Sequence, residues 1–133
     1  MATIRREFTI DAGPDDVWAA LQDFGAVHER LAAGFVVDSR LEGEDRVVTF
    51  FSGAVARERL VTIDDDERRL VYSMVESPLG STHYNAAAHV LPDGERTRFL
   101  WVIDVLPHEL EEPIGALMDR GAAAIRKTLE GAT

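Results

Sequence analysis

The order of the expected elements constrains this chain more than any other feature, because short strand-like segments lie between two helical stretches. The sequence is helix-like from Pro14 to about Ala32, strand-like from Phe35 to Leu106, and helix-like again to Glu130. Short links between successive strands favour an antiparallel meander, since a parallel pair requires a crossover of a dozen or more residues. A curved antiparallel sheet that wraps one long helix leaves space between them for a small apolar molecule.

Turn residues separate the strands, while proline and glycine mark the ends of the helices. Pro14 suits the first position of a helix, Gly25 interrupts the helical pattern, and Pro107 ends the last strand. The turns predict seven strands, at residues 1–10, 34–42, 47–51, 55–63, 70–76, 82–91 and 97–106. The apolar spacing predicts short helices at 14–24 and 26–32, and a helix of about 34 Å at 108–130. The fold class is therefore α+β.

Charge and composition exclude several classes of function. The 133 residues fit one domain, residues 1–133, and its 24 acidic and 14 basic residues give a net charge of −10. Such a surface repels nucleic acid and anionic membranes, so we expect neither as a partner. There is no run of about 18 apolar residues to span a membrane, and no early apolar run resembles a signal peptide. Cysteine is absent, which fits a reducing compartment, and we expect a soluble cytoplasmic protein.

Hairpin geometry assigns side chains to the two faces of the expected sheet. Partners across a turn share one face, so a turn at Asp93-Gly94 places Ala86 opposite Trp101 on the concave side. Turns near Leu79 and Asp66 pair the preceding strands in the same way, and so assign the inward-facing residues of the strands at 70–76 and 55–63. A single bulge would reverse the assignment of a strand. The expected concave face consists of Glu58, Leu60, Tyr72, Met74, Glu76, Tyr84, Ala86, Phe99 and Trp101.

Two stretches of the sequence resemble a known family. The opening pattern consists of Ile10-Asp11-Ala12, Pro14, Val17-Trp18, Leu21 and Asp23-Phe24. It is similar to the start of polyketide cyclase/dehydrase-like proteins, which belong to the SRPBCC superfamily with START lipid-transfer domains and the major birch-pollen allergen. The later run Arg98-Phe99-Leu100-Trp101, followed by Pro107 and a terminal helix, resembles the end of that pattern. The resemblance covers essentially the whole chain and implies the helix-grip fold, with a cavity between the sheet and the long helix. It implies no particular catalytic residue.

Two carboxylates on the expected concave face are the sharpest candidates for chemistry. Desolvation raises the pKa of a carboxyl group on an apolar face. A raised pKa suits Glu58 or Glu76 to proton transfer, or to binding a hydroxyl of a ligand. Tyr72 and Tyr84 are expected beside them, where each phenol is able to donate a hydrogen bond to a carbonyl or an enolate. Glu58 is the candidate catalytic residue.

Structural roles compete with both carboxylates. Glu76 lies close to Pro78 in the sequence, which favours a place at the solvated rim of the sheet. Glu58 has Arg57 and Arg59 as neighbours, and either arginine becomes a partner if the strand twists or bulges. We favour the rim for Glu76 and leave both interpretations open for Glu58.

Apolar residues are expected to supply most ligand contacts. The expected ligand-binding set combines Tyr72, Glu76 and Tyr84 with Met74, Phe99, Trp101, Leu117 and Gly121. Gly121 lies midway along the apolar stripe of the long helix, where glycine costs about 1 kcal/mol relative to alanine. Either a ligand or a close approach between helix and sheet explains the missing side chain.

No metal or cofactor site is expected. The turn assignment places His83 opposite Asp104, but on the solvent face, where an ion pair contributes only a few tenths of a kcal/mol. His83 and His89 share that face but lie about 20 Å apart along the strand, too far to bind one metal ion. No glycine-rich phosphate cradle follows a strand.

Three hypotheses of function follow from these features. The first is binding of a small hydrophobic or aromatic molecule, lipid-like or polyketide-like, in the internal cavity. The second is a cofactor-independent cyclase, dehydratase or isomerase that uses Glu58 with Tyr72 and Tyr84. The third is a dimeric interaction module that uses apolar residues on the outer face of the sheet, namely Val71, Val75, Leu100 and Val102.

Overall fold

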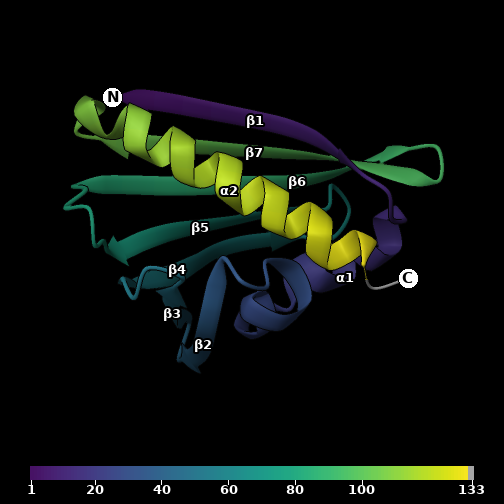
Figure 1. Ribbon diagram of the computed structural model, residues 1–133, viewed down its shortest axis with the longest axis horizontal. Helices are drawn as coiled ribbons and strands as arrows, with labels where there is room; N and C mark the ends of the chain where they lie inside the picture. Colours follow the sequence, from purple (N-terminus) through teal and green to yellow (C-terminus); the bar gives the residue numbers. More distant parts are fainter. Residues whose placement is uncertain (132–133) are drawn as a thin grey trace.

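The computed structural model describes residues 1–131, in which one curved sheet wraps around a long helix (Figure 1). All neighbouring strands are antiparallel, in the order β1-β7-β6-β5-β4-β3-β2. The strands are β1 (Ala2–Ile10), β2 (Val36–Glu42), β3 (Asp45–Phe50), β4 (Val55–Asp64), β5 (Arg69–Glu76), β6 (His83–Asp93) and β7 (Arg96–Leu106). The predicted meander is confirmed, and β1 joins it beside β7.

Helices occupy the two places that the sequence predicts. Between β1 and β2 lie α1 (Pro14–Gln22), the short helix η1 (Phe24–Ala26) and the single π-turn η2 (Val27–Leu31). After β7 come η3 (His108–Leu110) and the long helix α2 (Glu111–Glu130). Pro14 is in the first turn of α1, where its missing N–H costs no hydrogen bond, and Asp15 and Asp16 place negative charge at that end. The helix-grip arrangement is therefore present.

Helix α2 lies diagonally across the concave face of the sheet (Figure 1). Its buried side follows the predicted apolar stripe, with Ile114, Met118 and Ile125 each at most 4% exposed. From the sheet, alternate residues of β7 such as Phe99 and Ile103 point toward it and are also buried. The core thus forms where one helix stripe meets one face of the strands.

The predicted registers agree with the structure in one hairpin and are shifted in another. Glu58 pairs with Met74, as the sequence predicts, although bulges flank that part of the β4–β5 pair. Trp101 pairs with Ala88 rather than with Ala86. The β6–β7 turn therefore lies one residue later than predicted, at Gly94-Glu95, and Gly94 has a φ of 63°, which glycine adopts without strain. A shift of two partner positions keeps every side chain on its predicted face.

None of the helices in residues 1–131 is both long enough and apolar enough to span a membrane.

Candidate functional site

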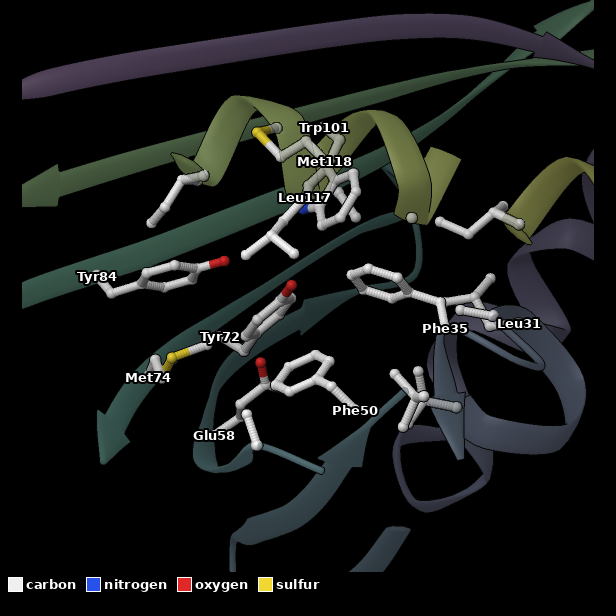
Figure 2. A pocket seen from close by; sticks show the side chains of 18 of the residues that line it. Leu31, Phe35, Phe50, Glu58, Tyr72, Met74, Tyr84, Trp101, Leu117 and Met118 are labelled. Carbon is white, nitrogen blue, oxygen red and sulfur yellow. The ribbon is translucent and has the colours of Figure 1, made fainter. Parts of the chain in front are cut away.

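A cavity of about 310 Å³ lies between the concave face of the sheet and α2. Strands β3 to β7 form one wall, α2 forms the opposite wall, and η2 with the segment leading into β2 closes one end. Most of the lining is apolar, and it includes Leu31, Phe35, Phe50 and Met118, whose side chains Figure 2 shows around the open centre. A hollow of this kind accommodates a small apolar molecule.

Most of the residues that the sequence places on the concave face do line this cavity, namely Glu58, Tyr72, Met74, Tyr84, Phe99 and Trp101. The two expected ligand-binding residues of α2, Leu117 and Gly121, line it as well. The sheet residues follow the predicted pairing, because Leu60 pairs with Tyr72 and Tyr72 pairs with Ala86. Residues that are neighbours in space, rather than in sequence, therefore assemble this wall.

The structure does not place Glu76 in the cavity. Its side chain is 73% exposed at the end of β5, and one of its carboxylate oxygens lies 3.7 Å from Nε of Arg57. This agrees with the rim position favoured above. Leu60 and Ala86 of the expected concave face do not line the cavity either: Leu60 is half-buried, and Ala86 is fully buried.

Glu58 is a buried member of the cavity wall, and its partner is an arginine that the sequence analysis did not consider. The Nε–H of Arg46 donates a hydrogen bond of 2.8 Å to Oε1 of Glu58, and the two side chains are only 7% and 6% exposed. Arg46 lies on β3 and pairs with Glu58 on β4. The surroundings of Glu58 thus contain a counter-charge and are not purely apolar.

Further contacts fix the guanidinium of Arg46. Its Nη1–H donates to the backbone carbonyl of Phe24 at 3.1 Å. The guanidinium carbon lies 4.0 Å from the ring centroid of Phe24 and 4.9 Å from that of Tyr72. Stacking on aromatic rings and hydrogen bonding on the edge suit a planar, weakly hydrated cation. The buried charge is therefore held in one position on the cavity wall.

Two phenols lie beside this ion pair. Figure 2 shows the hydroxyl groups of Tyr72 and Tyr84 and the carboxylate of Glu58 turned toward the cavity centre. Burial raises the pKa of both tyrosines well above the ordinary value of 10.0, and the negative charge of Glu58 contributes to the rise. Both phenols therefore remain protonated near neutral pH and are able to donate hydrogen bonds into the cavity.

The aromatic group at one end of the cavity includes an exposed residue of the lining. Phe51, in the turn after β3, lines the cavity and is 38% exposed. Its ring lies 5.8 Å from the ring of Phe35, centroid to centroid, and 3.9 Å from the guanidinium carbon of Arg120 on α2. The turn between β5 and β6 also lines the cavity, where Leu79 is 41% exposed.

The sequence analysis missed Arg46, the aromatic residues near Phe51, and the β5–β6 turn. Arg46 was missed because the third strand was expected to start at Val47, whereas β3 starts at Asp45. The expected turn at Ser52-Gly53 gave no correct signal either, because it pairs position 46 with Arg59, whereas the observed hairpin is centred on Ser52 and pairs Arg46 with Glu58. The aromatic end of the cavity had no such signal, because its residues lie in connections that follow no strand period.

On the outer face of the sheet, the predicted pair of His83 with Asp104 needs correction. His83 pairs with Leu106, and the partner of Asp104 on β6 is Asn85, so the predicted His83–Asp104 pair does not exist. Asp104 instead accepts a hydrogen bond of 2.6 Å from Oγ1 of Thr3.

The other outer-face residues show no site of their own. Residues 1–131 contain no cluster of three or more side chains suited to holding a metal ion. The apolar set is less exposed than predicted, because Val71 is 5% exposed and Leu100 and Val102 are half-buried, whereas Val75 is 42% exposed. A dimer formed through this face stays a prediction, which light scattering across a concentration series would check.

Comparison with solved structures agrees with this geometry. A solution NMR structure of a protein from Thermobifida fusca is 31% identical, with a TM-score of 0.77, and the match covers 98% of this chain and 91% of that one. A START superfamily protein from Mycobacterium smegmatis is 13% identical, with a TM-score of 0.83 and coverage of 98% and 99%. The ZhuI aromatase/cyclase from Streptomyces sp. R1128 is 18% identical, with a TM-score of 0.73 and coverage of 98% and 92%. At such low identity, the START superfamily protein and the aromatase/cyclase show only that the fold is alike.

No curated protein matches the sequence. A family model does match it: the model described as polyketide cyclase / dehydrase and lipid transport covers residues 1–131. The resemblance of the opening and closing motifs is thereby confirmed over nearly the whole chain. This chain belongs to the polyketide cyclase / dehydrase and lipid transport family.

Proposed function

We propose that the protein binds a small hydrophobic or aromatic molecule in the cavity between the sheet and α2. The observation that carries the proposal is a mostly apolar hollow of about 310 Å³ with a few polar groups gathered on one wall. Small-molecule sites in proteins have this composition, because apolar walls supply affinity and a few polar groups fix the orientation. The family description, which includes lipid transport, supports the same function.

The aromatic character of the ligand follows from the lining. Trp101, Tyr72 and Phe35 each present a ring to the cavity from a different strand or connection. Aromatic rings pack favourably against other rings in offset or edge-to-face contacts, each contributing about 0.5–1.5 kcal/mol beyond buried area. The polar wall adds a place for at least one oxygen of the ligand.

Tryptophan fluorescence tests the proposal, because the chain has two tryptophans and only Trp101 lines the cavity. The other, Trp18, donates a hydrogen bond of 3.1 Å to Asp65. In a Trp18→Phe variant, Trp101 is therefore the sole reporter. We expect emodin, naphthol, estradiol or lauric acid, or more than one of them, to quench Trp101 saturably and to raise the melting temperature by several °C at saturation. If all four leave both signals unchanged, the binding proposal fails.

Catalysis is a second candidate function, favoured by the position of Glu58 beside Tyr72 and Tyr84 on one wall. A carboxylate that faces a bound carbonyl compound is placed to take a proton from carbon, while a phenol donates a hydrogen bond to the oxygen that gains charge. The aromatase/cyclase of similar fold adds support of a general kind.

The two functions are separated by Glu58→Gln. If the protein is a cyclase, dehydratase or isomerase of this kind, the variant binds emodin-like compounds but loses turnover of a carbonyl-rich substrate. Undiminished turnover in a folded Glu58→Gln protein would remove Glu58 from the mechanism. Absence of turnover in the unaltered protein, with binding intact, would leave binding as the function.

A further inference from the structure

The buried charges that line the cavity already balance one another. The charged residues of the lining, within the part of the chain that the structure describes, are Arg46 and Glu58, and they form an ion pair of 2.8 Å. The cavity therefore has a net charge of zero. An ionised ligand would bring a charge without a counter-ion into a largely apolar space, which is strongly unfavourable.

We propose that this ion pair selects for neutral ligands: the protein binds an uncharged molecule with a phenol, hydroxyl or carbonyl oxygen, and discriminates against carboxylates and amines of the same shape. The proposal rests on the binding function proposed above and goes further by naming the ligand class. Long-chain fatty acids and other amphiphilic anions are excluded as preferred ligands.

The groups that would bind the oxygen of the ligand lie around the ion pair. Oε1 of Glu58 accepts from Arg46, and the carboxylate has a second oxygen that is able to accept a hydrogen bond from a ligand hydroxyl. Tyr72 lies diagonally across from Glu58, because it is two residues before Met74, the partner of Glu58. Tyr84 has the same diagonal relation to Tyr72, being two residues before Ala86. The two offsets run in opposite directions, so Tyr84 lies level with Met74 and Glu58, and the one acceptor and two donors form a triangle on the sheet.

Arg46 is poorly suited to anchor an anionic ligand, because its charge already has a partner. Two of its five N–H donors bond to Glu58 and to the carbonyl of Phe24, and its guanidinium carbon lies over the rings of Phe24 and Tyr72. A ligand carboxylate near Arg46 would also lie near the carboxylate of Glu58, and like charges at such separation repel. The net charge of −10 on the chain further disfavours the approach of anions.

The test compares naphthol, naphthoate and naphthylmethylammonium, substituted at the same ring carbon, by calorimetric titration of the full chain at neutral pH. These probes share one apolar body and differ in charge. We expect naphthol to bind at least about tenfold more tightly than naphthoate, since 1.4 kcal/mol of uncompensated charge corresponds to that ratio. The ammonium probe is expected to bind more weakly than naphthol too. Equal or tighter binding of naphthoate overturns the proposal while leaving the binding function intact.

Substitutions that change the charge of the cavity wall separate the effect of probe charge from that of ring packing. Glu58→Gln leaves Arg46 without its counter-charge, so naphthoate should gain at least about tenfold relative to naphthol. Arg46→Met leaves Glu58 uncompensated, so the ammonium probe should gain instead. The double variant Arg46→Met with Glu58→Met is neutral again, and naphthol should return to first place. A merely structural ion pair would change the affinities of all three probes in parallel, and this result overturns the proposal.

Two safeguards keep the experiment decisive. Circular dichroism and melting curves establish that each variant is folded, and if a single variant is not, the ranking of probes on the unaltered protein and on the double variant decides. If the three probes, emodin, estradiol and lauric acid all fail to bind the unaltered protein, the binding function itself fails, and the charge selection fails with it. That outcome differs from the one in which probes bind without regard to charge.

Discussion

Gly121 on α2 lies against the indole of Trp101 on β7, so closely that a Cβ atom at position 121 would be 3.0 Å from two carbons of the ring. It would also be 3.4 Å from a ring carbon of Phe35. Close approach of helix and sheet therefore accounts for the glycine, which was one of the two explanations that the sequence left open. The indole in this contact also lines the cavity.

Gly121→Ala should move Trp101 rather than unfold the protein. Alanine improves helix propensity by about 1 kcal/mol, whereas overpacking costs about 1–3 kcal/mol. The indole has the cavity beside it and is able to shift, so we expect the free energy of unfolding to fall by no more than about 1 kcal/mol in urea denaturation. Emodin affinity should fall as the ring enters the cavity. In a Trp101→Phe background, which removes the two contacting carbons, the same substitution should be neutral or stabilising. A loss above about 3 kcal/mol in the first variant would contradict a movable indole.

Glu58→Gln should destabilise the protein, because Arg46 keeps its charge while its partner becomes neutral in a buried place. Breaking a buried pair from one side costs about 3–5 kcal/mol, and the hydrogen bond that glutamine retains moves the expectation to the lower end. Chemical denaturation measures the change. The control is Glu7→Gln, which removes pairs with Arg5 and Arg98 whose arginine side chains are 65% and 51% exposed. It should cost about 1 kcal/mol or less. Equal effects of the two substitutions would show that burial of the inner pair has no energetic weight.

Acid should weaken the protein through Asp45. Hydrogen bonds from Arg59 and then Arg57 lower the pKa of Asp45 below its ordinary value of 3.8. A carboxyl group whose pKa is lower in the folded state binds protons more readily when unfolded. Its contribution is therefore complete above pH 3.8 and is lost as the pH falls through the lowered value. Stability measured from neutral pH downward should decline in that window.

Asp45→Asn tests this assignment. The variant should be less stable than the unaltered protein at neutral pH and should lose part of the decline in acid. Asp93→Asn, at the exposed tip of the β6–β7 hairpin, serves as the control and should keep the full decline. Parallel acid curves for the unaltered and Asp45→Asn proteins would rule out Asp45 as a source of acid sensitivity.

The tyrosines should resist ionisation until the fold opens. Tyr72 and Tyr84 are the two tyrosines of the chain, and burial raises the pKa of each above the ordinary value of 10.0. Above pH 10 the unfolded chain loses phenol protons that the folded chain keeps, so stability decreases as the pH rises. Phenolate absorbance should therefore appear together with the loss of circular dichroism. Reversible ionisation near pH 10 in folded protein would show that water reaches both phenols freely.

The fold was predictable because local signals agree with one another. Proline at position 14 and turn residues between the strands mark each element, and the apolar stripe of α2 follows the helical period. The concave face was also predicted correctly in the β6–β7 hairpin, although its register is shifted. Trp101 pairs with Ala88 instead of Ala86, and both alanines lie on the same face. The faces were kept because the partners shifted by two positions, whereas a shift of one position would have reversed every face.

The sequence predicted three of the polar residues that line the cavity but not Arg46. Glu58, Tyr72 and Tyr84 lie within strands, so their alternation reveals their direction. Arg46 lies at the start of β3, where a turn ends and a strand begins, and an arginine in such a place is usually a solvated residue. Its burial depends on the carboxylate of Glu58 and the rings of Phe24 and Tyr72, and only the assembled structure brings these groups together.

The contact between Arg120 and Phe51 bears on how the proposed ligand would enter the cavity. The two side chains join α2 to the turn after β3 by the attraction of a cation to a ring, and each belongs to an exposed residue. Separating such a pair takes on the order of 0.5–1 kcal/mol, little more than thermal energy. If a ligand enters at this end, separation of these two side chains would break no backbone hydrogen bond of α2 or of the sheet.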